Sequence, residues 1–160
     1  MAAPKTAKST KDQVKVLVRN KRAYHDYLVE QKFEAGIVLQ GSEVKSLREA
    51  HAVLGDAYVF VRNGEAWIGQ LSITEYAWAN RWNHTPKRER KLLLHRREID
   101  KIDEATAQKG MTALPLQIYL RNGRIKAEIG ICRGKKVHDK REDARKRDAT
   151  REIEMALKRR

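Results

Sequence analysis

The stretch that decides the fold runs from residue 116 to residue 129 and reads Leu116-Gln117-Ile118-Tyr119-Leu120-Arg121-Asn122-Gly123-Arg124-Ile125-Lys126-Ala127-Glu128-Ile129. Apolar and polar residues alternate on both sides of the Asn-Gly pair, which is the pattern of a half-buried strand. Asn-Gly between two such runs favours the type I′ turn, whose twist matches that of a β-hairpin. We therefore expect two antiparallel strands, with Leu116, Ile118 and Leu120 sharing the buried face of the first.

Other strand patterns lie upstream of this hairpin. Asn63-Gly64 separates residues 58–61 from residues 66–68 and predicts a further hairpin. Residues 25–40 alternate and residues 92–94 are a short apolar run, so each predicts a strand. About six strands, without the strand–helix–strand rhythm of a parallel sheet, indicate a mainly β fold, a small antiparallel barrel of the oligonucleotide-binding type.

Two or three short helices should flank this barrel. Ser42 is a suitable N-cap for a helix over residues 43–48, and residues 96–109 predict a helix that Gly110 ends. Residues 139–160 have high helix propensity because they are rich in Ala, Lys, Arg and Glu and contain no Pro or Gly. Isolated helices of this length are marginal in water, so we expect this tail to be disordered alone and helical on a surface that docks it.

The positive charge of the chain is concentrated at its two ends. The 160 residues include 35 Lys and Arg against 21 Asp and Glu, which gives a net charge of +14 and a pI near 10.1. Residues 1–22 and residues 133–160 each carry a net +6. The sequence therefore predicts a basic disordered arm over residues 1–18, a barrel domain over residues 19–133 and a basic tail over residues 134–160.

Composition also excludes several classes of protein. No apolar run is long enough to span a membrane, and the N-terminus lacks the apolar core of a secretion signal. The single cysteine, Cys132, cannot form an internal disulfide and is expected to be a small buried hydrophobe. One Cys and five scattered His do not supply the paired ligands of a zinc site. We expect a cytoplasmic monomer with no cofactor, no metal and no membrane partner.

Three segments combine basic side chains with aromatic rings, which is the composition of a nucleic-acid surface. They are residues 20–27, residues 78–91 and the basic run 134–141. Cationic groups hold phosphates, and aromatic faces stack on exposed bases. Any one such run is also typical of a solvated surface loop, but three together on a barrel of this class favour nucleic-acid binding.

Catalysis has little support in the residues. His25 and Asp26 near Glu34 do not define a nucleophile, a base and an orienting group. The sequence contains no Gly-rich phosphate loop and no paired metal carboxylates. A nuclease or another RNA-modifying enzyme is therefore the weakest interpretation, and incubation of RNA with and without a divalent metal would expose one.

Four longer motifs resemble one protein family. They read Asn20-Lys21-Arg22-Ala23-x-His25-Asp26-Tyr27, Phe33-Glu34-Ala35-Gly36-Ile37-Val38-Leu39-x-Gly41-x-Glu43-Val44-Lys45-Ser46-Leu47-Arg48, Pro86-x-Arg88-x-Arg90-Lys91-Leu92-Leu93-Leu94-His95 and Gly134-Lys135-Lys136-x-His138-Asp139-Lys140-Arg141. In this order, over residues 20–147, they resemble SmpB, the bacterial SsrA-binding protein family of trans-translation. The resemblance implies a non-enzymatic RNA-binding protein with an oligonucleotide-binding-type barrel and a C-terminal tail. Such a protein binds the tRNA-like domain of tmRNA and delivers it to ribosomes stalled on messages without a stop codon.

The resemblance also implies roles for individual residues. The tmRNA contacts map by motif to Asn20, Lys21, Arg22, Tyr27, Glu34, Leu93, Lys126 and Gly134, with Arg88, Arg90 and Lys91 as phosphate partners. The tail of the family enters the decoding centre and the empty mRNA channel of the ribosome. Ribosome contacts therefore map to Lys135, Lys136, His138, Asp139, Lys140 and Arg141. A helix of this kind docks only where no message occupies the channel.

A second interpretation stays open from the residues alone, a generic single-strand or structured-RNA-binding barrel protein associated with the ribosome. In such a protein, stacking on Trp78, Trp82 and Tyr24 would dominate binding, and the sequence of the RNA would matter little. Competition with bulk tRNA separates this interpretation from the tmRNA-specific one.

Overall fold

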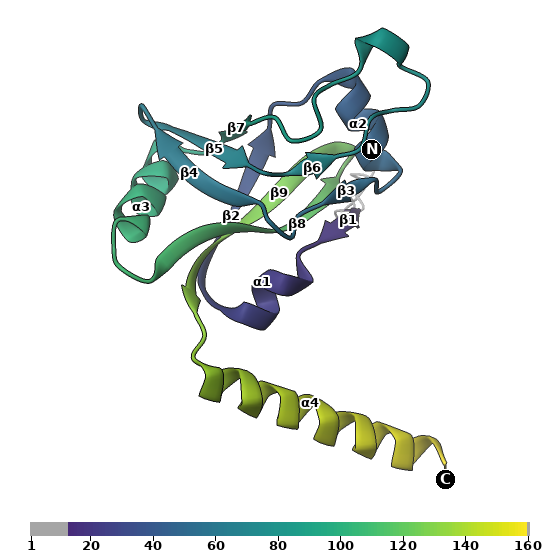
Figure 1. Ribbon diagram of the computed structural model, residues 1–160, viewed down its shortest axis with the longest axis vertical. Helices are drawn as coiled ribbons and strands as arrows, with labels where there is room; N and C mark the ends of the chain where they lie inside the picture. The colour runs from purple at the N-terminus through teal and green to yellow at the C-terminus, as the bar shows by residue number, and fades with distance from the viewer. Residues whose placement is uncertain (1–12, 160) are drawn as a thin grey trace, which may run out of the picture.

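A closed antiparallel barrel forms the body of the molecule in the computed structural model, which describes residues 13–159 (Figure 1). The ring consists, in spatial order, of β8 (Met111–Arg121), β4 (Tyr58–Arg62), β5 (Glu65–Gly69), β7 (Arg90–Leu93), β2 (Tyr27–Ile37) and β9 (Arg124–Gly134). Because β9 pairs with both β2 and β8, the sheet closes on itself. The predicted mainly β barrel is therefore confirmed.

The barrel begins earlier in the chain than the sequence indicated. β1 (Val14–Arg19) pairs antiparallel with the second half of β8, so residues 14–18 of the predicted arm belong to the sheet. A bulge between Val16 and Val18 turns Leu17 into the core. Without β1, the second half of β8 would present an unpaired edge, which accounts for the extra strand. Residues 1–12 of the predicted arm lie outside the described residues.

Both predicted Asn-Gly hairpins are present. Asn63 and Gly64 have φ of 53° and 72°, and Asn122 and Gly123 have φ of 51° and 78°. A type I′ turn requires positive φ at both central residues, which Asn and Gly adopt with little strain. The two turns therefore fix the register of β4 with β5 and of β8 with β9.

One predicted detail of the second hairpin is wrong, because Leu116 does not share a face with Ile118. A bulge between Pro115 and Gln117 interrupts the alternation along β8. Ile118 therefore packs in the main core, whereas Leu116 packs in a smaller cluster with Cys132. Cys132 is fully buried, as expected.

Short helices and two-residue strands decorate the barrel. They are α1 (Lys21–Asp26), α2 (Gly41–Arg48), β3 (Ala52–Val53) with its partner β6 (Ser72–Ile73), the 3₁₀ turn η1 (Asn80–Trp82) and α3 (Arg96–Thr106). α1 replaces the start of the strand predicted over residues 25–40, because the Asn20 side chain accepts a hydrogen bond from the backbone of Ala23 and caps a helical turn. α3 contributes the buried Ile99 and Ile102 to the main core.

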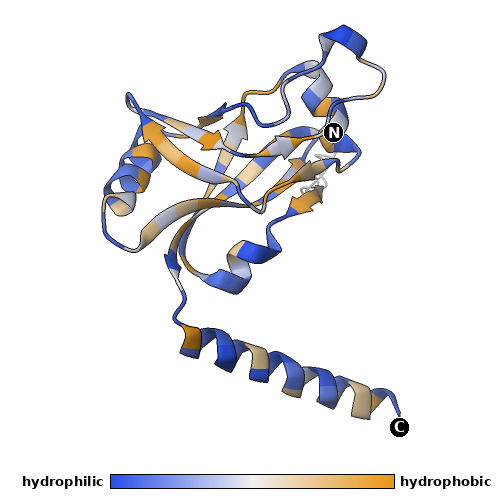
Figure 2. Cartoon of the chain, viewed as in Figure 1, coloured by the Kyte–Doolittle hydropathy of each residue, from blue (hydrophilic) through white to orange (hydrophobic). Residues whose placement is uncertain are grey.

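The C-terminal tail is one continuous helix, α4 (Val137–Lys158), which projects from the barrel (Figure 1). Its surface is mainly hydrophilic (Figure 2), and none of its residues is buried. Residues 137–158 are thus helical in the structure, whereas the expected transition, from disorder alone to a helix on a docking surface, stays a prediction. The Asp139 carboxylate accepts a hydrogen bond from the Lys136 N–H at 3.2 Å and caps the first turn.

Candidate nucleic-acid interface

The residues that the sequence assigned to RNA binding lie in three places on the barrel. The first is a cleft of about 540 Å³ that β2, β5, β7, β9 and the start of α3 line. Four of the assigned residues line this cleft, namely Glu34, Lys91, Leu93 and Lys126. We call it the Glu34 cleft.

Strand register brings these residues together. Gly36 on β2 pairs with Leu93 on β7 on one side and with Lys126 on β9 on the other. A Cβ at residue 36 would lie 3.2 Å from the Cβ of Leu93, so the glycine leaves room for the leucine. Leu93 is 56 % exposed and supplies an apolar surface at the cleft.

Hydrogen bonds stabilise the negative charge of Glu34 in the cleft. The hydroxyl of Tyr119 and the guanidinium of Arg121, the latter at 2.9 Å, both donate to the Glu34 carboxylate. These two hydrogen bonds hold the pKa of Glu34 below its usual range, and the bond from Tyr119 has the larger effect. Lys91 forms an ion pair with Glu65 at 2.8 Å, and Lys126 supplies a second ammonium group.

This combination of groups suits a folded RNA strand. An exposed leucine contacts a ribose or a base, ammonium groups hold phosphates, and a carboxylate accepts a hydrogen bond from a 2′-hydroxyl. Because the cleft is preformed on three paired strands, these groups are already oriented before a ligand arrives.

The second place surrounds α1, where a cleft of about 280 Å³ includes Asn20, Arg22 and Tyr27. Tyr27 pairs with Gly134 at the far end of β2 and β9. Arg22 is exposed and forms an ion pair with Asp56 at 3.1 Å. The neighbouring Lys21, at the start of α1, is also exposed and lines two hollows beside Arg147.

Asn20 has a structural role that the sequence assignment did not predict. Its side chain is 3 % exposed, and its amide donates to the carbonyls of Pro115 at 2.9 Å and Leu54 at 3.3 Å. Its oxygen caps α1. The side-chain amide is therefore occupied within the protein, so Asn20 positions α1 and does not present a donor to RNA.

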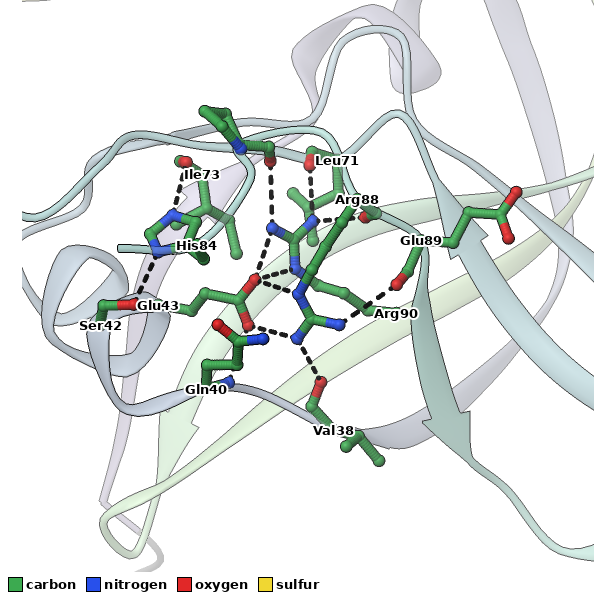
Figure 3. A network of polar contacts seen from close by, with 11 residues as sticks. Val38, Gln40, Ser42, Glu43, Leu71, Ile73, His84, Arg88, Glu89 and Arg90 are labelled. Atoms are coloured by element: carbon green, nitrogen blue, oxygen red, sulfur yellow. Dashed lines mark hydrogen bonds and ion pairs between the residues drawn. The ribbon is translucent and has the colours of Figure 1, made fainter. Parts of the chain in front are cut away.

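The third place is a buried network around Glu43, shown in Figure 3. Arg88 donates to the Glu43 carboxylate through Nε at 2.7 Å and Nη2 at 2.6 Å. Arg90 donates through Nε at 2.8 Å, and its remaining donors reach the carbonyls of Leu71, Arg88 and Pro86. We call Glu43, Arg88 and Arg90 the Glu43 triad.

The Glu43 triad corrects the phosphate role assigned to Arg90. The side chains of Arg90 and Glu43 are both 0 % exposed, so the Arg90 guanidinium cannot meet a phosphate in this conformation. The Arg88 side chain is 27 % exposed and forms part of the same network. Burial alone raises the pKa of Glu43, but hydrogen bonds from Arg88, the Gln40 N–H and Arg90 outweigh it and lower that pKa.

A hydrogen-bonded histidine extends this network to the loop between β6 and β7. His84 is 3 % exposed, and its Nε2 donates to the carbonyl of Ile73 at 2.9 Å. A carbonyl only accepts, so Nδ1 of His84 accepts from the Ser42 hydroxyl at 2.8 Å. Ser42 is therefore not the predicted N-cap of α2, since Gln40 occupies that position.

The start of the tail is tied to the α1 region. The Lys135 side chain is 9 % exposed and forms an ion pair with Asp143 at 2.5 Å, and its ammonium donates to the carbonyl of Tyr24. Lys140 forms an ion pair with Asp26 at 3.2 Å. Hydrogen bonds from His25 and Lys140 lower the pKa of Asp26. These contacts anchor the first two turns of α4.

The other assigned tail residues divide between exposed and structural positions. Lys136, His138 and Arg141 are exposed, and His138 lies 3.7 Å from Glu142. Asp139 caps the helix. The exposed cations are available to an RNA partner, whereas Lys135 and Asp139 shape the root of the tail. Sequence reasoning missed Asp26 and Asp143 as the partners of Lys140 and Lys135.

Two structural features are absent from residues 13–159. No group of three or more His, Cys, Asp or Glu side chains in this part of the chain is placed to hold a metal ion. No helix in the same range is long and apolar enough to cross a membrane.

Comparisons with known proteins agree with the geometry. A family model described as SmpB protein matches residues 17–159. An SsrA-binding protein of Geotalea uraniireducens (strain Rf4) is 50 % identical over 146 residues, which cover 91 % of this chain and 97 % of the relative. An SsrA-binding protein of Halalkalibacterium halodurans is 53 % identical over 144 residues, covering 90 % of this chain and 94 % of the relative.

A solved structure is also similar. It is described as "tmRNA-SmpB: a journey to the center of the bacterial ribosome", and one of its chains matches with a TM-score of 0.65 and 40 % identity. The match covers 75 % of this chain and 85 % of that chain.

Proposed function

This chain belongs to the SmpB family, and from that premise we propose that it binds tmRNA and delivers it to stalled ribosomes in trans-translation. The family model spans nearly all of the described residues, barrel and tail alike. The relatives that match over nine-tenths of the chain are SsrA-binding proteins.

The observation that carries this proposal is the Glu34 cleft. Residues far apart in the sequence, Glu34, Leu93 and Lys126, line one hollow. Their chemistry matches the phosphates, riboses and unpaired bases of a folded RNA. We assign to this cleft the contact with the tRNA-like domain of tmRNA.

The tail takes the second role in the proposal. No residue of α4 is buried, and the cations Lys136, Lys140 and Arg141 lie at its root. A helix of this kind binds an RNA-lined path through its charges. We propose that α4 occupies the decoding centre and the vacant mRNA channel, and that an occupied channel excludes it.

The proposed activity is binding without catalysis, by a monomer in the cytoplasm. Side chains with shifted pKa are common at catalytic sites, but they also occur in structural ion-pair networks. Here Glu34, Glu43, Asp26 and Asp143 each have hydrogen-bond partners that account for the lowered pKa. Their shifts therefore have a structural explanation.

Binding of the full-length protein to a tmRNA tRNA-like fragment tests the proposal. The assay is run at near-physiological salt with excess ordinary tRNA, because non-specific electrostatic binding weakens steeply with salt. We expect tight binding that the competitor does not displace. Binding that tRNA abolishes would instead identify a generic RNA-binding barrel.

A further inference from the structure

The loop between β6 and β7, residues 74–89, carries two tryptophans that the proposed function does not use. Trp78 is 81 % exposed and Trp82 is 76 % exposed, more than any other large hydrophobic side chain in residues 13–159. Large aromatic side chains dominate the energetics of interfaces because of the area that they bury. Two largely exposed indole rings on one loop therefore indicate a contact surface. We call residues 74–89 the Trp loop.

Hydrogen bonds within the Trp loop order the backbone that carries both indoles. The Asn83 side chain accepts from the Tyr76 N–H and donates to the Tyr76 carbonyl, both at 2.8 Å. The N–H of Trp82 donates to the carbonyl of Ala79 at 3.0 Å, which forms the turn η1. The rings are thus carried by an ordered backbone, so little backbone entropy is lost when they bind.

The base of the Trp loop is fixed to the barrel. His84 connects the loop to Ile73 on β6 and to Ser42 on α2 (Figure 3). The N–H of Ile73 donates to the carbonyl of Pro86 at 3.0 Å, and Arg88 continues into the buried Glu43 triad. The loop is therefore anchored at both ends, and only its tip projects.

Positive charge surrounds the aromatic rings. The Arg81 guanidinium lies 5.3 Å from the Trp82 ring centre, and the Lys45 ammonium lies 5.3 Å from that of Tyr76. Lys87 is also exposed on this loop. Rings for stacking beside cations for phosphates are the arrangement that single-stranded nucleic acid requires.

We propose that the Trp loop is a second RNA-binding surface, in which Trp78 and Trp82 stack on unpaired bases and Arg81 and Lys87 hold the adjoining phosphates. The surface lies apart from the Glu34 cleft, and the loop and α4 project from opposite ends of the molecule (Figure 1). The unpaired bases belong either to tmRNA or to ribosomal RNA. The proposal is independent of tmRNA specificity in the Glu34 cleft.

Fluorescence of the two indoles tests the proposal directly. The third tryptophan, Trp67, lies on β5 with its Nε1 buried and unbonded, so Trp67→Phe removes background emission without removing a hydrogen bond. Full-length Trp67→Phe protein is titrated with the tRNA-like fragment, with purified ribosomal RNA and with ribosomes. Stacking on a base should quench the indole emission in at least one RNA arm, and that arm identifies the source of the bases.

Variants separate stacking from structure. Trp78→Ala with Trp82→Ala should weaken affinity for the quenching RNA by about thirtyfold or more, because stacking contributes substantially for each of the two bases. Trp78→Phe with Trp82→Phe is the matched control and should retain most of the affinity, since each ring face is kept. Circular dichroism confirms that both variants are folded. The proposal would be overturned if the alanine variant bound the RNA as tightly as the parent. It would also be overturned if ribosomes quenched the indole emission and neither RNA did, because that result would place a protein on the loop.

Discussion

Replacing Glu43 with glutamine should destabilise the barrel strongly. Glu43→Gln keeps the size of the side chain and removes its charge. The carboxylate now neutralises two guanidinium groups, of which Arg90 is fully buried. In the variant, Arg90 would keep its bonds to the carbonyls of Leu71, Arg88 and Pro86 and would have no counter-charge in the network.

The size of the effect follows from this geometry. Breaking a buried ion pair by removing one partner costs about 3–5 kcal/mol, because an uncompensated charge stays buried. Three carbonyl acceptors remain for Arg90, so we expect the lower end, about 3 kcal/mol. For a domain of this size, that corresponds to a fall in the melting temperature of roughly 10 °C.

Urea unfolding followed by circular dichroism measures this change. Glu89→Gln is the matched control. Glu89 forms an ion pair with Arg62 at 2.8 Å, which is also the distance from Arg90 Nε to Glu43, but both side chains of the Glu89 pair are about half exposed. A surface pair contributes about 0–1 kcal/mol. A Glu43→Gln variant within about 1 kcal/mol of the parent would refute the view that the triad needs its buried charge.

The contribution of Glu43 to stability depends on pH. Because the pKa of Glu43 is lowered in the folded state, its charge stabilises the fold above the pKa of the unfolded chain. That contribution is lost as the pH falls through the lowered pKa. The stability difference between parent and Glu43→Gln should therefore be full at pH 7 and shrink in acid.

Three further predictions concern RNA binding, the tail and the thiol. Lys126→Ala should weaken binding to the tRNA-like fragment and lower the slope of log K against log salt by about 1, in filter binding at several salt concentrations. Lys140→Ala with Arg141→Ala should leave the affinity for the tRNA-like fragment within about twofold but abolish peptide tagging on stalled ribosomes, because we propose that the tail binds the ribosome. A parallel loss of that affinity would instead make the tail part of the tmRNA-binding surface. Cys132 is buried, which raises the pKa of its thiol to about 11, so iodoacetamide should modify it slowly in native protein and rapidly in urea.

Local patterns predicted most of the barrel. Asn63-Gly64 and Asn122-Gly123 specify turns whose geometry depends on two residues, so both hairpins follow from sequence. β1 was missed because it buries one side chain, Leu17, and is stabilised by a partner strand about a hundred residues away in the chain. The bulge in β8 was missed because alternation carries no sign of an extra residue.

Contacts between distant residues limited the prediction of the site. The motif resemblance singled out Glu34, Leu93 and Lys126, but only strand register shows that Gly36 brings them together. Arg88 and Arg90 lie 45 and 47 residues from Glu43, so the sequence did not show that this basic run sends one arginine, Arg90, into the interior and a second, Arg88, into the same network. Charge in a sequence does not distinguish a cation for RNA from one that neutralises a buried carboxylate.

The pairing of β2 with β9 places the Glu34 cleft and the root of the tail at opposite ends of these two strands. Gly36 pairs with Lys126 in the Glu34 cleft, and Tyr27 pairs with Gly134 where the tail begins. Nine residues of strand separate these pairs, or about 30 Å at about 3.3 Å per residue. We therefore expect that an RNA bound in the cleft alone leaves α4 free to bind elsewhere. For this reason, substitutions in the cleft and in the tail should impair separate steps, tmRNA capture and ribosome engagement.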